Sequence, residues 1–220
     1  MKVGLISDVH ASAPALNAVM GDMPPVDEVV HAGDVVGYNP YPNAVVDTFR
    51  REDVASISGN HDRAVAGGTD FGFHSVAGQA VEWTRDALRE DCLEYVEELR
   101  EEREPVDGVY LAHGAPGAPD RYTYPEEFTA ELLPDGVEVL VLGHTHVQGK
   151  EEFEEGIVVN PGSVGQPRDG DPRAAYAVLD LSSLEVELRR VEYPIERVQE
   201  NIRREEGLPD SLADRLERGL

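Results

Sequence analysis

The segment "VEVLVLGHTHVQG" (residues 137–149) begins as an apolar run and ends in two histidines separated by one residue. The apolar run is typical of a buried β-strand. Residues i and i+2 of an extended segment point to the same side, so His144 and His146 would be delivered to one place. The segment therefore predicts a strand whose end presents two imidazoles together.

Similar strand ends occur elsewhere in the chain. The apolar runs 2–7, 26–34, 54–62 and 108–116 also end in side chains that can bind a metal. These side chains are Asp8 and His10, Asp34, Asn60, and His113. In open α/β sheets, binding sites gather at the carboxyl ends of the strands. We therefore expect all seven side chains to converge at one edge of the fold.

The order of the predicted elements indicates an α/β fold. Helices are predicted over 13–23, 42–52 and 74–104, the last broken near residue 90, with two short helices in 194–220. The later strands, over 156–165, 174–181 and 184–193, lack long helices between them, which favours a second sheet. We expect one domain over residues 1–220, with strands in two layers and helices outside.

The charge of the chain limits its partners. Asp and Glu number 44 against 19 Lys and Arg, for a net charge of −25, which argues against nonspecific binding to nucleic acid or to an anionic membrane. A dispersed acidic bias resembles halophilic proteins, because at ~1 M salt the Debye length is only ~3 Å. The single cysteine, Cys92, excludes an intramolecular disulfide, and a cytoplasmic location is the simplest interpretation.

The seven donors suit a pair of hard or borderline metal ions. Two carboxylates, four imidazoles and one amide oxygen are too many for one ordinary site, and they favour zinc, manganese or iron over softer ions. Two carboxylates against two divalent ions leave a net positive pocket, which would attract phosphate. A metal pair ~3.5–4 Å apart can clamp both oxygens of an in-line displacement.

Five short blocks resemble one known family in their order along the chain. "DVH" (8–10), "GDVVG" (33–37), "GNHD" (59–62), "HG" (113–114) and "GHTH" (143–146) are similar to the blocks of the calcineurin-like metallophosphoesterases. "GDVVGYNPYPNAVV" and "NPGSVGQPRDGDPRAAYAVLD" further resemble a prokaryotic branch related to the YfcE-type phosphodiesterases. The resemblance implies a four-layer αββα sandwich of two mixed β-sheets flanked by helices.

The resemblance also implies a role for each donor. One ion would be held by Asp8, His10 and His146, the other by Asn60, His113 and His144, with Asp34 bridging them. Manganese is the expected metal, with iron, zinc, nickel or magnesium as alternatives. A metal-bridging hydroxide would attack a small phosphate ester or nucleotide-like substrate.

Two residues beside ligand Asn60 receive catalytic roles from the same resemblance. His61 would protonate the leaving alkoxide or stabilise charge on phosphorus. Asp62 would orient an active-site imidazole, or else it serves as a helix N-cap.

Several alternatives remain open at this point. A non-catalytic scaffold of the same fold would substitute the catalytic histidine, whereas His61 is retained; a protein Ser/Thr phosphatase would need C-terminal regions without an obvious counterpart here. "NPGSVGQPR" (160–168) is either a tight turn or, through its amides and Arg168, a substrate contact. Departures from the branch pattern at Ser12, Asn39 and Tyr41 are expected to alter the substrate pocket. A homodimer is also left open.

Overall fold

The computed structural model describes residues 1–67 and 75–220, and its strands form two five-stranded sheets. The first sheet has the order β10 (Glu185–Val191), β9 (Ala174–Asp180), β1 (Lys2–Ile6), β2 (Glu28–His31) and β3 (Ala55–Ser56). The second has the order β4 (Glu102–Val106), β5 (Val109–Ala112), β6 (Val139–Val141), β8 (Ile157–Asn160) and β7 (Gly149–Glu152). Both sheets are mixed: β1, β2 and β3 are parallel, as are β5, β6 and β8, while the remaining pairs are antiparallel.

The inner faces of the two sheets pack against each other. Leu5 and Leu179 of the first sheet and Leu111 and Val141 of the second belong to one cluster of side chains, and all four are fully buried. Strands β1 and β8 are apolar along nearly their whole length because both of their faces are covered. This packing holds the two sheets in a fixed relation to each other.

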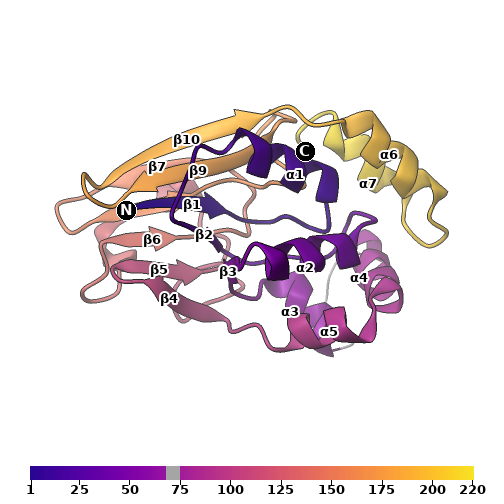
Figure 1. The fold of residues 1–220 in the computed structure, drawn as a ribbon, viewed down its shortest axis with the longest axis horizontal. Coiled ribbons are helices and arrows are strands. Elements are labelled where there is room, and N and C mark those ends of the chain that lie inside the picture. The colour runs from indigo at the N-terminus through magenta and orange to yellow at the C-terminus, as the bar shows by residue number, and fades with distance from the viewer. Residues whose placement is uncertain (68–74) are drawn as a thin grey trace.

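The described helices share one apolar cluster with side chains of the first sheet such as Tyr176. They are α1 (Ala13–Asp22), α2 (Pro42–Arg51), α3 (Asn60–Gly67), α4 (Ser75–Ala87), α5 (Glu90–Glu97), α6 (Ile195–Arg204) and α7 (Asp210–Leu216). Figure 1 shows α1 beside the strands and the other helices gathered near the strand ends. Helix α6 illustrates why these helices pack against the core. Its Val198 and Ile202, four residues apart, are fully buried, while arginines and glutamates occupy the other faces. None of the described helices is both long enough and apolar enough to cross a bilayer.

The outer face of the second sheet has a thinner cover. Two 3₁₀ turns, η1 (Pro125–Glu127) and η2 (Ala130–Leu132), lie over it. Phe128 between them joins a small apolar cluster with Leu140 and Leu142. The predicted four-layer α/β sandwich of two mixed sheets is therefore confirmed, with short turns in place of long helices on this side.

Three sequence predictions differ from the structure. Only Ala55–Ser56 of the predicted strand 54–62 is extended, and its Gly-Asn-His-Asp end enters α3. Strands β4 and β7 were not expected, because "EREPV" and "GKEE" lack an apolar alternation. Both lie at edges of the second sheet, where charged residues are tolerated and discourage further strand pairing. The helical prediction 74–104 divides into α4, α5 and β4; residue 74 itself lies outside the described residues.

The packing between the sheets can be tested at Leu111. Leu111→Ala should lower the free energy of unfolding by about 2–5 kcal/mol, because a fully buried side chain would leave a cavity. Urea denaturation measures this. The matched control Leu220→Ala, at a side chain that is 56% exposed, should change stability by no more than about 0.5 kcal/mol. Equal effects of the two substitutions would contradict the described core.

Candidate metal centre

The predicted donors come together where the parallel strands of both sheets end. Asp8 follows β1, Asp34 follows β2, and Asn60 follows β3 in the first sheet. His113 follows β5, and His144 follows β6 after a short turn, in the second. Figure 1 shows β1, β5 and β6 pointing the same way, so one end of the stacked sheets carries the donors. The expected convergence at strand ends is what the structure has.

The backbone reason for this convergence differs from the one inferred from sequence. His144 and His146 do not alternate along an extended segment, because both have left-handed backbone angles, with φ of 67° and 59°. Asp8, His10 and Asp34 are also left-handed, with φ of 51°, 46° and 61°. Such a conformation costs a non-glycine residue of order 1–3 kcal/mol. Tight turns, rather than strand alternation, aim these side chains, and the cost is concentrated at the candidate site.

Four of the donors form a compact buried group. The distance from His10 Nε2 to Asp34 Oδ2 is 3.4 Å, and from His146 Nε2 to Asp8 Oδ1 it is 3.3 Å. The two Nε2 atoms of His10 and His146 are 3.1 Å apart. Ligand atoms of all four residues lie within 4.8 Å of one another, so this group can hold a metal ion.

The remaining three donors, Asn60, His113 and His144, form a second group next to Asp34. His113 Nε2 is 3.5 Å from Asp34 Oδ2 and 3.2 Å from Asn60 Oδ1. The rings of His113 and His144 are 4.9 Å apart between centroids. Within the described part of the chain, the buried Nε2 of His144 has no hydrogen-bond partner. Asp34 therefore contacts imidazoles of both groups.

Hydrogen bonds to the backbone decide which ring nitrogens are free to bind an ion. The Nδ1 atoms of His10, His113 and His146 donate to the carbonyl oxygens of Val36 (3.2 Å), Ala32 (2.8 Å) and Gln166 (2.5 Å), respectively. A carbonyl oxygen only accepts, so each Nδ1 carries hydrogen and each Nε2 of a neutral ring presents a lone pair. Backbone carbonyls fix metal-binding histidines in this way.

The Nε2 atoms therefore face other acceptors. The Nε2 atoms of His10 and His146 lie next to each other. His10 Nε2 also lies near the Asp34 carboxylate and His146 Nε2 near that of Asp8, while His113 Nε2 lies near Asn60 Oδ1. Contacts between buried acceptors are repulsive unless a proton or a metal cation lies between them. The donor set thus fits divalent cations, which would convert each repulsive contact into coordination.

The pKa values of the buried donors also favour binding of a cation. Burial opposes ionisation of Asp34, but the neighbouring imidazoles, His113 first, outweigh it and hold the pKa of the carboxyl well below its usual value. Burial lowers the pKa of His144 to about 3. The pKa of His113 is raised to about 9, because attraction to Asp34 outweighs burial. Without a metal, a proton on His113 supplies the positive charge that the centre requires.

Comparison with known proteins identifies the fold that carries this centre. Residues 1–184 match the calcineurin-like phosphoesterase superfamily domain. The chain belongs to the calcineurin-like phosphoesterase superfamily. It is 31% identical to the uncharacterized protein MJ0912 of Methanocaldococcus jannaschii over 242 residues, which cover 97% of this chain and 96% of the relative.

Two further relatives refine this placement within the superfamily. The crystal structure of a metallophosphoesterase from Sphaerobacter thermophilus has a TM-score of 0.88 and 36% identity, covering 100% of this chain and 99% of the other. Phosphodiesterase YfcE of Escherichia coli is 28% identical over 84% of this chain and 91% of its own. The expected resemblance to the family and its YfcE-type branch is confirmed, as is the expectation of a metal-dependent phosphoric ester hydrolase.

Asp62 of the phosphoesterase lies within the first turn of α3, so it is not the N-cap residue, and its hydrogen bonds go to backbone amides. Its carboxylate accepts hydrogen bonds from the backbone amides of Val35 (3.1 Å), Val36 (3.0 Å) and Gly59 (2.9 Å). No described imidazole is bonded to it. Burial, together with repulsion from Asp34, raises the pKa of this carboxyl to about 7. Asp62 therefore ties the Asp34 loop to the Asn60 loop, rather than orienting a ring directly.

Glycine is required where these two loops touch. A side chain on Gly59 would overlap the Asp34 carboxylate, and one on Gly33, at φ 97°, would come within 2.5 Å of His113 Nδ1. Only glycine at these two positions therefore allows the loops to approach each other beside the centre.

A cavity of about 130 Å³ opens on the centre. Its walls are Asp34, Tyr38, Asn60, His61, Ala77, Tyr122, His144, His146 and Arg168. Nothing in the sequence indicated that Tyr38 and Tyr122 line this cavity. The ring centroids of Tyr38 and His61 are 4.3 Å apart, and those of Tyr122 and His144 are 4.0 Å apart.

The departures at Ser12, Asn39 and Tyr41 were expected to alter the pocket, but they do not belong to its described walls. Asn39 instead stabilises the backbone at a predicted ligand, because its Nδ2 donates to the carbonyl oxygen of His10 at 2.8 Å.

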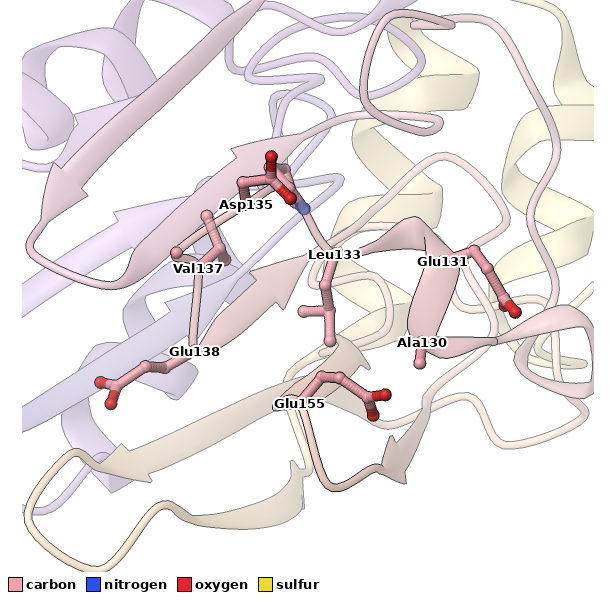
Figure 2. Close-up of a pocket in the computed structure, with 9 residues that line it drawn as sticks. Ala130, Glu131, Leu133, Asp135, Val137, Glu138 and Glu155 are labelled. Carbon is pink, nitrogen blue, oxygen red and sulfur yellow. The ribbon is translucent and has the colours of Figure 1, made fainter.

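A larger cavity, of about 600 Å³, lies near the beginnings of β6 and β8 and has the wrong chemistry for this family (Figure 2). Its described walls include four carboxylates, Glu131, Asp135, Glu138 and Glu155, and no lysine or arginine. These carboxylates would repel a phosphate ester. Size alone therefore does not locate the site.

Asp62→Asn tests the connection between the two loops. The amide would offer a donor where three backbone N–H groups need acceptors, so we expect a loss of about 1–3 kcal/mol in the free energy of unfolding. Thermal or urea unfolding measures it, with the exposed Asp135→Asn as the matched control. Identical stability of the two variants would contradict the structural role of Asp62.

Proposed function

We propose that residues 1–220 act as one metallophosphoesterase domain that hydrolyses small phosphodiesters with two divalent metal ions. The observation that supports two ions is the position of Asp34. Its Oδ2 is 3.4 Å from His10 Nε2 and 3.5 Å from His113 Nε2, and these rings belong to different donor groups. One carboxylate shared by two groups of acceptors favours a bridged pair over a single ion.

The proposed ligands follow from these groups. Asp8, His10 and His146 hold one ion, Asn60, His113 and His144 hold the other, and Asp34 binds both. With neutral rings, two carboxylates leave two divalent ions incompletely neutralised, which attracts an anionic ester. Bound ions would lower the pKa of a water that serves as nucleophile and would neutralise charge on the phosphoryl oxygens. Nitrogen and oxygen donors suit manganese, which we propose as the first metal to test.

His61 is proposed to assist the leaving group. It stands at the beginning of α3 and lines the small cavity, with its ring 4.8 Å from that of His10. Burial lowers the pKa of its imidazole to about 4, although Asp34 opposes this, so the ring is neutral at pH 7 before substrate binds. An anionic ester favours the protonated ring, and that proton is the one delivered to the departing oxygen.

The substrate class rests on cavity size and on relatives. A space of about 130 Å³ accommodates a phosphoryl group and little more, so the ester is small or extends outward. Related proteins from E. coli carry the name phosphodiesterase, which supports a diester over a monoester.

The direct test of this function is hydrolysis of bis-(p-nitrophenyl) phosphate. Turnover should appear with manganese, disappear on chelation and return when metal is restored. Parallel assays with p-nitrophenyl phosphate and with a phosphopeptide separate a phosphodiesterase from a monoesterase and from a protein phosphatase. Absence of metal-dependent turnover with any divalent ion would refute the proposal.

His61→Ala should retain both metal ions and lose most of its turnover. General acid catalysis contributes roughly 10²–10⁴-fold, so kcat should fall by about that factor. Metal content, measured by plasma mass spectrometry, serves as the control. A variant with full metal content and near-normal kcat would remove His61 from the mechanism.

Asp34→Ala should lose both ions, since the residue shared by the two donor groups would be gone. Metal content after gel filtration gives the answer, and the exposed Asp135→Ala provides the matched control. Two tightly retained ions in Asp34→Ala would show that this carboxylate is not the bridge.

A further inference from the structure

We propose that Arg168 binds a second phosphate of the substrate, beside the one that is hydrolysed. The substrate class is then a phosphodiester that carries an additional phosphate group. This inference rests on the proposed function for its first phosphate, and it adds a specificity determinant to the same site.

The guanidinium of Arg168 is held in place by neutral groups. Its Nη2 donates to Gln166 Oε1 at 2.9 Å and to Tyr38 Oη at 3.3 Å, and its Nε donates to Gln166 Oε1 at 3.3 Å. Its Cζ lies 5.8 Å from the centroid of the Tyr38 ring. Among the described residues, its Nη1 has no hydrogen-bond partner. An oriented guanidinium with unused donors is suited to bidentate binding of phosphate.

Arg168 is also kept apart from carboxylates in a strongly acidic protein. The chain has 44 acidic side chains against 19 lysines and arginines. Arg50, Arg89 and Arg173 illustrate the usual arrangement, because each pairs with an aspartate at 2.6–2.8 Å. No carboxylate in the described part of the chain lies within ion-pair distance of Arg168. Its charge is therefore available to an anion from solution.

The position of Arg168 places this charge between two cavities. It lines the cavity of about 130 Å³ over the metal centre and an adjoining cavity of about 290 Å³, and the two share Tyr38 and Ala77. The adjoining cavity is also lined by Arg215. Binding sites for small ligands typically measure ~300–1,000 Å³, which the first cavity alone does not reach. The rest of the substrate therefore extends past Arg168 into a space with two arginines.

Gln166 orients the guanidinium of Arg168 from a buried position. Its side chain is 1% exposed, and its Nε2 has no hydrogen-bond partner among the described residues, while its Oε1 holds Arg168. A buried amide with an unused donor is costly. Gln166 lines neither cavity, so its buried side chain fixes the direction in which Arg168 presents its charge.

Binding of two nucleotides that differ by one phosphate tests the inference. Isothermal titration calorimetry on the manganese-loaded protein compares two product analogues, thymidine 3′,5′-bisphosphate and thymidine 5′-monophosphate, which correspond to hydrolysed diesters with and without the additional phosphate. We expect the bisphosphate to bind about 10-fold more tightly or better, because a hydrogen bond between charged groups is stronger than one between neutral groups. Arg168→Met should remove this preference, and Arg168→Lys should restore part of it, since lysine keeps the charge but not the fork.

The control variant is Arg173→Met, which removes a positive charge from the same region of the chain but one already paired with Asp171. It should keep the preference for the bisphosphate. Equal affinity of the wild-type protein for the two nucleotides would overturn the inference, as would an Arg168→Met variant that weakens both equally. Because binding requires no turnover, a preference without hydrolysis of any diester would count against the proposed function alone.

Discussion

The arrangement on which the site depends is a set of buried acceptors that face one another. Backbone carbonyls fix the Nδ1 atoms of three histidines as donors, so their Nε2 lone pairs point at carboxylates, at an amide oxygen and at each other. These atoms are almost entirely buried, so bulk water relieves little of the repulsion. A positive charge between them would stabilise the arrangement, and membership of a metal-dependent family indicates that a metal ion supplies it.

Packing of the two sheets holds these acceptors close together despite their mutual repulsion. Two sheets stacked through a continuous apolar core bring the ends of β1, β2 and β3 opposite the ends of β5 and β6. The final aim of each side chain comes from left-handed turns at residues such as Asp8, Asp34 and His144. Asp62 then clamps two of the turns together through backbone amides. The free energy of core packing offsets the strain of the turns.

The sequence predicted where the strands end and which donors follow them. It did not predict the backbone conformation of the turns after the strands. The apolar runs and the polar residue after each run are local signals, so β1, β5 and β6 and their following donors could be predicted. The left-handed turns at His144 and His146 carry no such signal, and the alternation first inferred for them was wrong. The edge strand β7 was missed because its charged residues fit strand pairing only once the neighbouring β8 is present. Tyr38 and Tyr122 reach the cavity through tertiary contacts that have no pattern in sequence, whereas Arg168 was one of the alternatives left open for residues 160–168.

The most direct measurement is a diffraction experiment on crystals soaked in manganese, with data collected at a wavelength where manganese scatters anomalously. The account predicts two anomalous peaks flanking the carboxylate of Asp34, one near His10 and one near His113. A single peak bound only by Asp8, His10 and His146, or no peak at all in this centre, would contradict it.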